Sequence, residues 1–307
     1  MSTPARPRSA AARLSRVALI ALVATVPAAC GDGAVPVDKA AATAGFDQSL
    51  HDRLPDAVLS AGVVRVATDA SYAPASFFAP DGRTIVGFEP DLGAALGQVL
   101  GVRFEFVNVD FTDVLPQLVR HEVDAVISAM TDTPDREKQA DFVNYFTAGT
   151  AILVKRGNPQ AVTDLKDLCG KVVAVEEGTV QVDLLERSQR GCSGASIDVR
   201  TYPTNSDALL QLRTGRAAAV LNDYPPAAYV ATDVKTRGHF QLASTTQYEP
   251  GVYGIAIAKD RTQLRNVLRE ALDQLIREGD YEEILHRWDV SEGAVRLASV
   301  NAGRTDG

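Results

Sequence analysis

Residues 124–142 read DAVISAMTDTPDREKQADF, an apolar run followed by a polar turn and a short helical pattern. The run at 124–129 predicts a buried strand, because it is short, apolar and bounded by polar residues. Thr133 can cap a helix that has Pro134 in its first turn. A buried strand that leads through a capped turn into a helix is the repeating unit of an α/β sheet.

The same alternation of strand and helix extends toward the N-terminus. Two β-branched runs and two helical patterns precede residue 124: VVRVAT at 63–68, a helix from Asp91 to about Leu100, VRFEFV at 102–107 and a helix from Thr112 to Arg120. Such alternation predicts parallel sheets with helices on their faces. The fold class is therefore α/β.

A weak internal repeat predicts two lobes. LPQLVRHEVDAVIS at 115–128 matches LLQLRTGRAAAVLN at 209–222 in spacing and in apolar pattern, and each is a helix, a turn and a buried strand. GVVRVAT at 62–68 has a counterpart in GKVVAVEEG at 170–178. Any βαβ unit yields some such matches, but two in the same order favour a duplicated architecture.

The first 29 residues form a separate segment. Four arginines precede an uncharged apolar run from Val17 to Ala29, which is too short to span a bilayer comfortably and is typical of a signal peptide. Ala28 and Ala29 before Cys30 resemble a lipobox, with Pro27 where leucine is usual, so we expect Cys30 to be lipidated. The alternative is an ordinary signal peptide that leaves this cysteine as a free thiol.

The composition around the folded body indicates loose ends and an acidic surface. Residues 30–56 predict a flexible tether and residues 296–307 a loose tail. Loss of the four leader arginines leaves 27 of the 31 basic residues against 39 acidic ones, a formal charge of −12. Such a surface repels nucleic acid, which we do not expect as a partner.

Two cysteines remain beyond the leader. Cys169 and Cys192 are 23 positions apart, and a disulfide between them would persist outside the cytoplasm. It would stabilise the protein by roughly 3 kcal/mol on the chain-entropy model. Two buried free thiols are the alternative. A metal site is the weaker interpretation, since none of the four histidines stands near either cysteine.

Polar residues gather where the expected strands end. In open α/β sheets, ligands bind just beyond the carboxyl ends of the strands. The residues at these positions are Asp69 and Tyr72, then Ser128 to Arg136, Glu176 to Thr179, and Asn222 with Asp223.

Two charged residues stand out among them. Arg136 offers a planar fork that suits a carboxylate, with donors at Ser128 and Thr131; alternatively it is a solvated helix arginine paired with Asp132 or Asp135. The Asp223 carboxylate can accept hydrogen bonds from an ammonium group, or it can initiate the turn before Tyr224 and Pro225.

Aromatic and small residues complete the candidate site. Tyr72, Phe77, Phe78 and Phe111 can supply flat apolar walls, although single aromatic residues more often belong to a core. The backbone N–H groups of Gly178 and Thr179 precede a helical pattern from about Val180 to Ser188 and can hold an anion.

Five motifs in one order then point to a known family. They are TDASYAPASF, GFEPDLGAALGQVLG, DAVISAMTDTPDREKQADF, DLCGKVVAVEEGT and GDYEEILHRWDV. The chain resembles the family 3 extracellular solute-binding proteins, the polar amino acid receptors of ATP-driven importers, over roughly Val63 to Val290. Glu89 and Asp91 match the acidic pair of the family signature, with Pro90 where an aliphatic residue is more usual.

The resemblance implies roles for individual residues. Arg136 would clamp the ligand α-carboxylate, assisted by Thr131, the backbone near Ser128, and Thr179 of the second lobe. Asp223 would bind the α-ammonium. The family's side-chain contacts fall on Asp69, Tyr72 and Phe111, and the residues expected to bind ligand are Asp69, Tyr72, Phe111, Ser128, Thr131, Arg136, Glu176, Thr179 and Asp223.

The resemblance also implies an organisation and partners. The fold would be a type II periplasmic-binding-protein-like arrangement, with two open sheets flanked by helices. Lobe 1 would span 57–148 plus 249–295 and lobe 2 residues 149–248, with crossing strands near Thr150 to Val154 and Gly251 to Ala258 as the hinge. A lipid-anchored monomer would deliver its ligand to a membrane-embedded ABC permease and its ATPase, without a cofactor. The pattern of two cysteines at DLCGK also resembles an actinobacterial-style subgroup, which supports the disulfide.

Two other classes of function are weaker interpretations, because the sequence retains both the carboxylate clamp and the ammonium partner of a receptor, and we do not expect an enzyme. Certain prephenate and arogenate dehydratases resemble these binding proteins, and Glu176 and Glu177 could act as general acids if burial raised a pKa. A lipoprotein could also present ligand to a separate sensor. Within the receptor interpretation, Asp69 and the nearby glutamates would repel an acidic side chain, which favours a cationic or neutral polar amino acid such as Arg, Lys, His or Gln.

Overall fold

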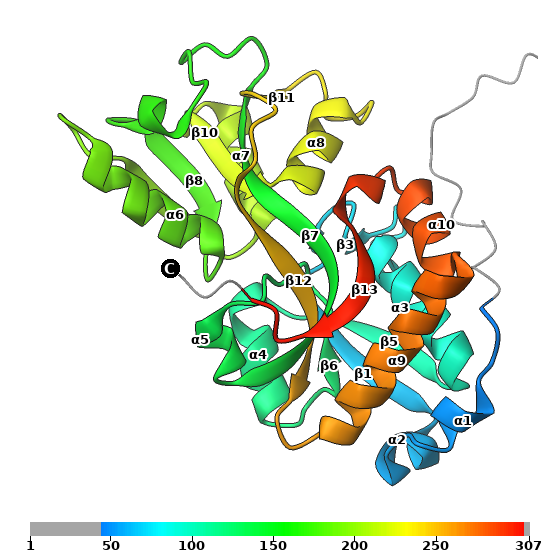
Figure 1. Ribbon diagram of the computed structural model, residues 1–307. Helices are drawn as coiled ribbons and strands as arrows, with labels where there is room; N and C mark the ends of the chain where they lie inside the picture. Colours follow the sequence, from blue (N-terminus) through cyan, green and yellow to red (C-terminus); the bar gives the residue numbers. More distant parts are fainter. Residues whose placement is uncertain (1–43, 304–307) are drawn as a thin grey trace, which may run out of the picture. The chain divides into compact units, whose positions relative to one another are not determined.

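The computed structural model describes residues 44–303 (Figure 1). The predicted signal peptide, the predicted lipidation site Cys30 and most of the predicted tether lie outside the described residues. Across residues 44–303, no helix has both the length and the apolar character needed to span a bilayer.

A ten-stranded mixed sheet has the order β5-β1-β6-β12-β7-β10-β8-β9, with β11 and β13 also paired to β7. One end of the sheet is parallel and consists of β5 (Arg103–Asn108), β1 (Val63–Thr68) and β6 (Ala125–Val126). The other end is also parallel and consists of β10 (Ala219–Asp223), β8 (Val172–Glu176) and β9 (Asp198–Tyr202). We call the parts of the chain around these two groups the first and second lobes.

Two long antiparallel strands join the lobes, namely β7 (Ala140–Lys155) and β12 (Tyr248–Ala258). With 16 residues, β7 extends about 50 Å at about 3.3 Å per residue, long enough to run through both lobes (Figure 1). It pairs with β12 in the first lobe and with β10 and β11 (Phe240–Leu242) in the second. The α/β class is confirmed, but the two expected sheets are continuous because this strand belongs to both.

The first lobe is covered by amphipathic helices, namely α3 (Phe88–Leu100), α4 (Phe111–Val119), α9 (Thr262–Glu278) and α10 (Asp280–Arg287). Helix α9 packs on the sheet because its buried apolar residues recur at helical spacing and form one face. They are Leu264, Val267, Leu268, Ala271, Leu272 and Leu275. The helices predicted from Asp91 and Thr112 begin slightly earlier, at Phe88 and Phe111.

The second lobe covers both faces of its sheet, with α6 (Val180–Ser188), α7 (Asn205–Thr214) and α8 (Tyr224–Thr232). In β8, Val173 and Val175 pack in one buried cluster and Ala174 in another, as alternation along a strand requires. A disulfide joins Cys169 before β8 to Cys192 after α6, with the two Cα atoms 5.7 Å apart. The predicted pairing of these cysteines is confirmed.

The internal repeat corresponds to real structure, since residues 115–128 include most of α4 and all of β6, whereas 209–222 include the end of α7 and most of β10. The strand expected at 124–129 is shorter than predicted, because only Ala125–Val126 pair in the sheet and Ala129 takes a left-handed φ of 45°. The chain therefore turns at this point into α5 (Pro134–Glu137).

Part of the predicted tether and part of the predicted tail form ordered secondary structure. Within the expected tether, α1 (Gln48–His51) buries Leu50, and Leu54 is also buried before α2 (Asp56–Ala61). Within the expected tail, β13 (Ala294–Val300) pairs with β7 and buries Ala298. The remaining short elements are β2 (Ser71–Tyr72), β3 (Ser76–Phe78), β4 (Ile85–Val86), η1 (Leu165–Leu168), η2 (Gln189–Gly191) and η3 (Ser291–Gly293).

Candidate functional site

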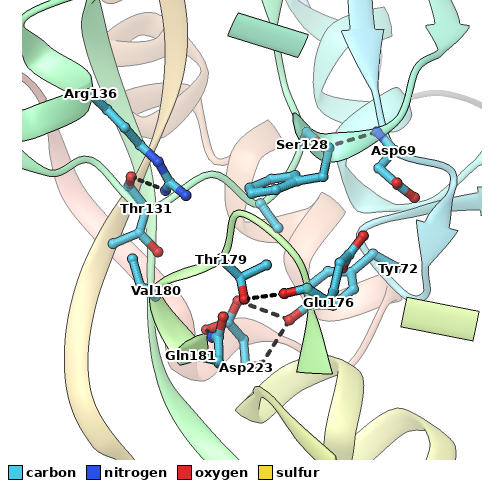
Figure 2. A pocket seen from close by; sticks show the side chains of 12 residues that line it. Asp69, Tyr72, Ser128, Thr131, Arg136, Glu176, Thr179, Val180, Gln181 and Asp223 are labelled. Carbon is cyan, nitrogen blue, oxygen red and sulfur yellow. Dashed lines mark hydrogen bonds between the residues drawn. The ribbon is translucent and has the colours of Figure 1, made fainter. Parts of the chain in front are cut away.

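A small polar cavity lies between the carboxyl ends of the strands of the two lobes (Figure 2). Its volume is about 20 Å³. All nine residues expected to bind ligand line it, together with three that were not among those nine, Ala129, Val180 and Gln181. The lining is complete with Asp69, Tyr72, Phe111, Ser128, Thr131, Arg136, Glu176, Thr179 and Asp223.

Arg136 supplies the positive charge of the cavity. Thr133 caps α5 by accepting a hydrogen bond from the Arg136 backbone N–H at 3.3 Å, which positions the side chain over the cavity. The guanidinium donates to the Thr131 carbonyl at 2.6 Å and, across the cleft, to the Gly178 carbonyl at 2.9 Å. Desolvation lowers the Arg136 pKa to about 10, so the side chain remains cationic at neutral pH.

The alternative interpretation of Arg136, an ion pair with its neighbours, does not describe the structure. Asp135 pairs with Lys138, and Asp132 accepts a hydrogen bond from Asn144. Arg136 instead lies over the Phe111 ring, with the guanidinium carbon 5.4 Å from the ring centre.

Asp223 supplies a buried negative charge at the end of β10. Its carboxylate accepts hydrogen bonds from Gln181 Nε2 at 2.8 Å and from the Tyr72 hydroxyl at 3.1 Å, and its side chain makes no cap bond to α8. The Asp223 carboxylate therefore does not cap α8 and remains in the cavity. Burial raises the pKa of Asp223 to about 6, against the opposing effects of the hydrogen bonds from Tyr72 and Gln181 and of the Arg136 charge.

Two further carboxyl groups, those of Asp69 and Glu176, line another part of the cavity (Figure 2). Asp69 follows β1 and accepts a hydrogen bond from Ser71 N at 2.8 Å, while its own N–H donates to Ser128 Oγ at 2.9 Å. Glu176 ends β8 and lines the same part of the cavity. Burial raises the pKa of Asp69, and burial together with the Asp69 charge raises the pKa of Glu176 well above its usual range.

The N-terminus of α6 forms the wall opposite Arg136. Thr179 is its N-cap, and the Thr179 hydroxyl donates to the Glu176 carbonyl at 2.8 Å. Gly178 before it has a φ of 73°, and an added Cβ would lie 3.0 Å from Thr112 of the first lobe. Glycine at this position permits the close approach of the two lobes.

Several residues considered from the sequence lie elsewhere. Phe77 packs against Tyr229 and Trp288, and Phe78 is exposed, so neither lines the cavity. Glu177 and Asn222 are also absent from the lining. Within residues 44–303, no cluster of three or more His, Cys, Asp or Glu side chains could hold a metal ion.

Two α/β lobes joined by long strands, with opposite charges facing one small cavity, define a two-lobed solute-binding protein. The chain belongs to the bacterial extracellular solute-binding proteins, family 3, whose family model matches residues 64–291. The family indicated by the five sequence motifs is thereby confirmed.

Individual relatives carry more specific names. The arginine-binding protein ArgT of Corynebacterium glutamicum is 28% identical over 84% of this chain and 86% of its own, and the L-cystine-binding protein TcyJ of Escherichia coli is 29% identical over 74% and 82%. An ancestral amino acid-binding protein, described as a precursor of cyclohexadienyl dehydratase, has a similar structure, with a TM-score of 0.68 and 33% identity over 76% of this chain and 98% of that one. All three are named as binding proteins.

Proposed function

We propose that this protein is the extracytoplasmic substrate-binding component of an ABC importer, and that it carries an amino acid with a cationic or neutral polar side chain. The observation that carries the proposal is the placement of Arg136 and Asp223, a cation and an anion, on one cavity. A zwitterion offers the matching pair of charges. Membership of the family and the relatives named for arginine and L-cystine support this class of ligand.

Each charged group of the cavity already has a partner that a ligand would replace. We expect the ligand α-carboxylate to take the place of the Gly178 carbonyl beside Arg136, with further donors from Thr131, the backbone near Ser128, and Thr179. We expect the α-ammonium to donate to Asp223 in place of the Tyr72 hydroxyl. Charge-assisted bonds in a buried site are strong, so the exchange favours the ligand.

The cavity volume implies that the cleft must open. A volume of about 20 Å³ holds about one water molecule and no amino acid. We expect opening to occur where β7 and β12 pass between the lobes, and we place the lobes at 57–148 plus 249–295 and at 149–248. The register shift between Tyr248 and Gly251 on β12 lies in this passage and weakens the pairing of the two strands there.

The remaining lining residues favour a cationic or neutral side chain. Tyr72 and Phe111 offer flat walls, and Asp69 and Glu176 offer oxygen acceptors. A ligand carboxylate beside these two acids would be repelled, whereas a guanidinium or ammonium group would be attracted. We therefore expect arginine or lysine to bind more tightly than glutamate.

We further propose that Cys30 carries the lipid anchor at the extracytoplasmic face of the cell membrane. The apolar run before Cys30 and the adjacent alanines support this assignment. The monomer would deliver its ligand to a membrane-embedded permease with its ATPase. The spacing of the two disulfide cysteines beside DLCGK supports an actinobacterial-style subgroup.

The test is thermal unfolding of the chain from Gly31 onward, which retains every described residue, against a panel of amino acids. A ligand at a thousand times its dissociation constant adds about 4 kcal/mol and raises the Tm by several degrees or more. Arg136→Ala and Asp223→Ala should abolish the shift. Lys138→Ala, an exposed cation that follows α5, should retain it.

Prephenate, arogenate and a sugar serve as control ligands in the same experiment. A Tm shift with one of these compounds and with no amino acid would contradict the proposed receptor. A shift with glutamate and none with arginine, lysine, histidine or glutamine would leave an amino acid receptor but overturn the proposed specificity.

A further inference from the structure

The carboxyl group of Glu176 has an unusual environment. It is 5% exposed, and its Oε1 atom has no hydrogen-bond partner among the described residues. It lies beside the carboxyl group of Asp69 in the same small cavity, and Asp69 is also 5% exposed (Figure 2). Two carboxylates are both hydrogen-bond acceptors, so without a proton this contact leaves a buried acceptor unsatisfied and two like charges together.

The other groups around the pair do not neutralise it. Asp223 adds a further negative charge, and the tyrosines that face this region, Tyr72 and Tyr253, are neutral because burial and Asp223 hold their pKa values well above the usual range. Arg136 is the cation of the cavity, but its guanidinium is engaged by the carbonyls of Thr131 and Gly178. The Ser71 backbone N–H donates to the Asp69 carboxylate without adding charge, and Ser128 Oγ accepts only from the Asp69 backbone N–H.

The pair also connects the two lobes. Asp69 follows β1 of the first lobe, and Glu176 ends β8 of the second. A proton on Glu176 turns the contact into a hydrogen bond donated to the Asp69 carboxylate, and this bond spans the cleft.

We propose that Asp69 and Glu176 share one proton in the free protein, and that the cationic side chain of a ligand displaces this proton to solvent. The inference rests on the proposed function. In the step, the O–H bond of the Glu176 carboxyl group breaks, the proton passes to water or buffer, and the ligand cation donates hydrogen bonds to the two carboxylates. The pair gains one negative charge and the ligand supplies one positive charge, so the charge buried at this end of the cavity is unchanged.

The consequence is a specific pH dependence. While the free pair holds its proton, binding of a cationic ligand must release one proton, so affinity rises with pH by up to tenfold per unit. A ligand with a neutral side chain leaves the proton in place and uses Glu176 as a donor. Arginine and its neutral analogue citrulline therefore differ in their pH dependence at this pair.

Asp223 complicates the comparison because its pKa of about 6 also allows proton release when an ammonium group binds. This contribution is common to arginine and citrulline, which have the same α-ammonium group. The difference between the two ligands isolates the Asp69 and Glu176 pair.

The experiment is calorimetric titration of the chain from Gly31 onward with arginine and with citrulline, between pH 5.5 and 8, in buffers of different ionisation enthalpy. We expect arginine to release up to one more proton than citrulline, and its Kd to fall by up to tenfold more per pH unit. Glu176→Gln, whose amide can still donate to Asp69, should remove the difference in proton release while citrulline still binds. Glu177→Gln, outside the cavity, should behave as the wild type.

Equal proton release by arginine and citrulline in the wild type, with both ligands bound, would overturn the shared proton and leave the proposed function intact. Persistence of the difference in Glu176→Gln, shown to be folded by its binding of citrulline, would also overturn it. Absence of binding by any amino acid would instead contradict the proposed function itself.

Discussion

Glu89 supports the cavity without lining it. It is fully buried in α3 and accepts hydrogen bonds from Ala129 N at 2.6 Å, from Ser76 Oγ at 2.7 Å and from the Tyr145 hydroxyl. Ala129 lines the cavity in a left-handed conformation that alanine rarely adopts. The signature acid therefore holds the turn that carries Ser128 and Ala129 in place.

Substitution of Glu89 tests this support. Glu89→Gln replaces one acceptor oxygen by an NH2 donor. This buried donor then faces an N–H or hydroxyl group that now donates a hydrogen bond to Glu89. We expect the free energy of unfolding to fall by about 1–3 kcal/mol in urea titration. Glu105 is an exposed glutamate on β5, and Glu105→Gln should lower the free energy of unfolding by less than about 0.5 kcal/mol. Equal values for both variants would refute the supporting role.

The position of the cavity was predictable because strand ends are local features of the sequence. Asp69, Glu176 and Asp223 each end or follow an apolar run, and all three reach the cavity. Gln181 was not predicted as a cavity residue, because its partners, Thr150 and Asp223, lie on strands that are distant in the sequence. Phe77, considered either as a cavity wall or as a core residue, packs against Trp288, and this contact joins residues far apart in the chain.

Strand β13 lies where the sequence predicts a loose tail. Its residues, AVRLASV, include only one buried side chain, Ala298, so no hydrophobic period marks the strand. The strand is held in place by pairing with β7 and by hydrogen bonds with residues distant in the sequence. The Ala298 N–H donates to Asp273 at 2.8 Å, and the Asn301 side chain accepts from the Phe142 N–H at 2.8 Å.

Removal of this strand gives a second stability prediction. Truncation after Gly293 leaves the Phe142 N–H and Asp273 without these partners and uncovers the edge of β7. At roughly 1 kcal/mol per lost hydrogen bond, we expect a loss of at least about 2 kcal/mol in chemical denaturation. The matched control is truncation after Gly303, which keeps β13. If both truncated proteins unfold at the same denaturant concentration, β13 contributes nothing to stability.

At the scale of the whole molecule, the buried acids make stability depend on pH. The pKa of Asp223 is about 6 in the folded protein against about 3.9 for an unperturbed aspartate. Between these values the folded state binds more protons than the unfolded state, so the free energy of unfolding falls as pH rises. Once pH exceeds about 6, the loss from this one group is about 3 kcal/mol.

The Asp223→Asn variant should lack this part of the pH dependence. We expect the ligand-free variant to lose about 2 kcal/mol less stability than the wild type between pH 4 and pH 7, measured by urea unfolding at each pH. Asp56→Asn, at an exposed position in α2, should follow the wild-type curve. Parallel curves for Asp223→Asn and the wild type would show that the buried carboxyl group does not titrate in this range.

The bonds that cross the closed cleft have a consequence for the speed of capture. The Arg136 guanidinium donates to the Gly178 carbonyl and the Tyr72 hydroxyl donates to the Asp223 carboxylate, and each of these bonds joins one lobe to the other. Encounters with solute succeed only during the intervals when these bonds are broken, so the observed association rate is the diffusional rate multiplied by the fraction of molecules that are open. A variant that loses one cross-cleft bond but keeps the ligand contacts would therefore capture solute faster than the natural protein.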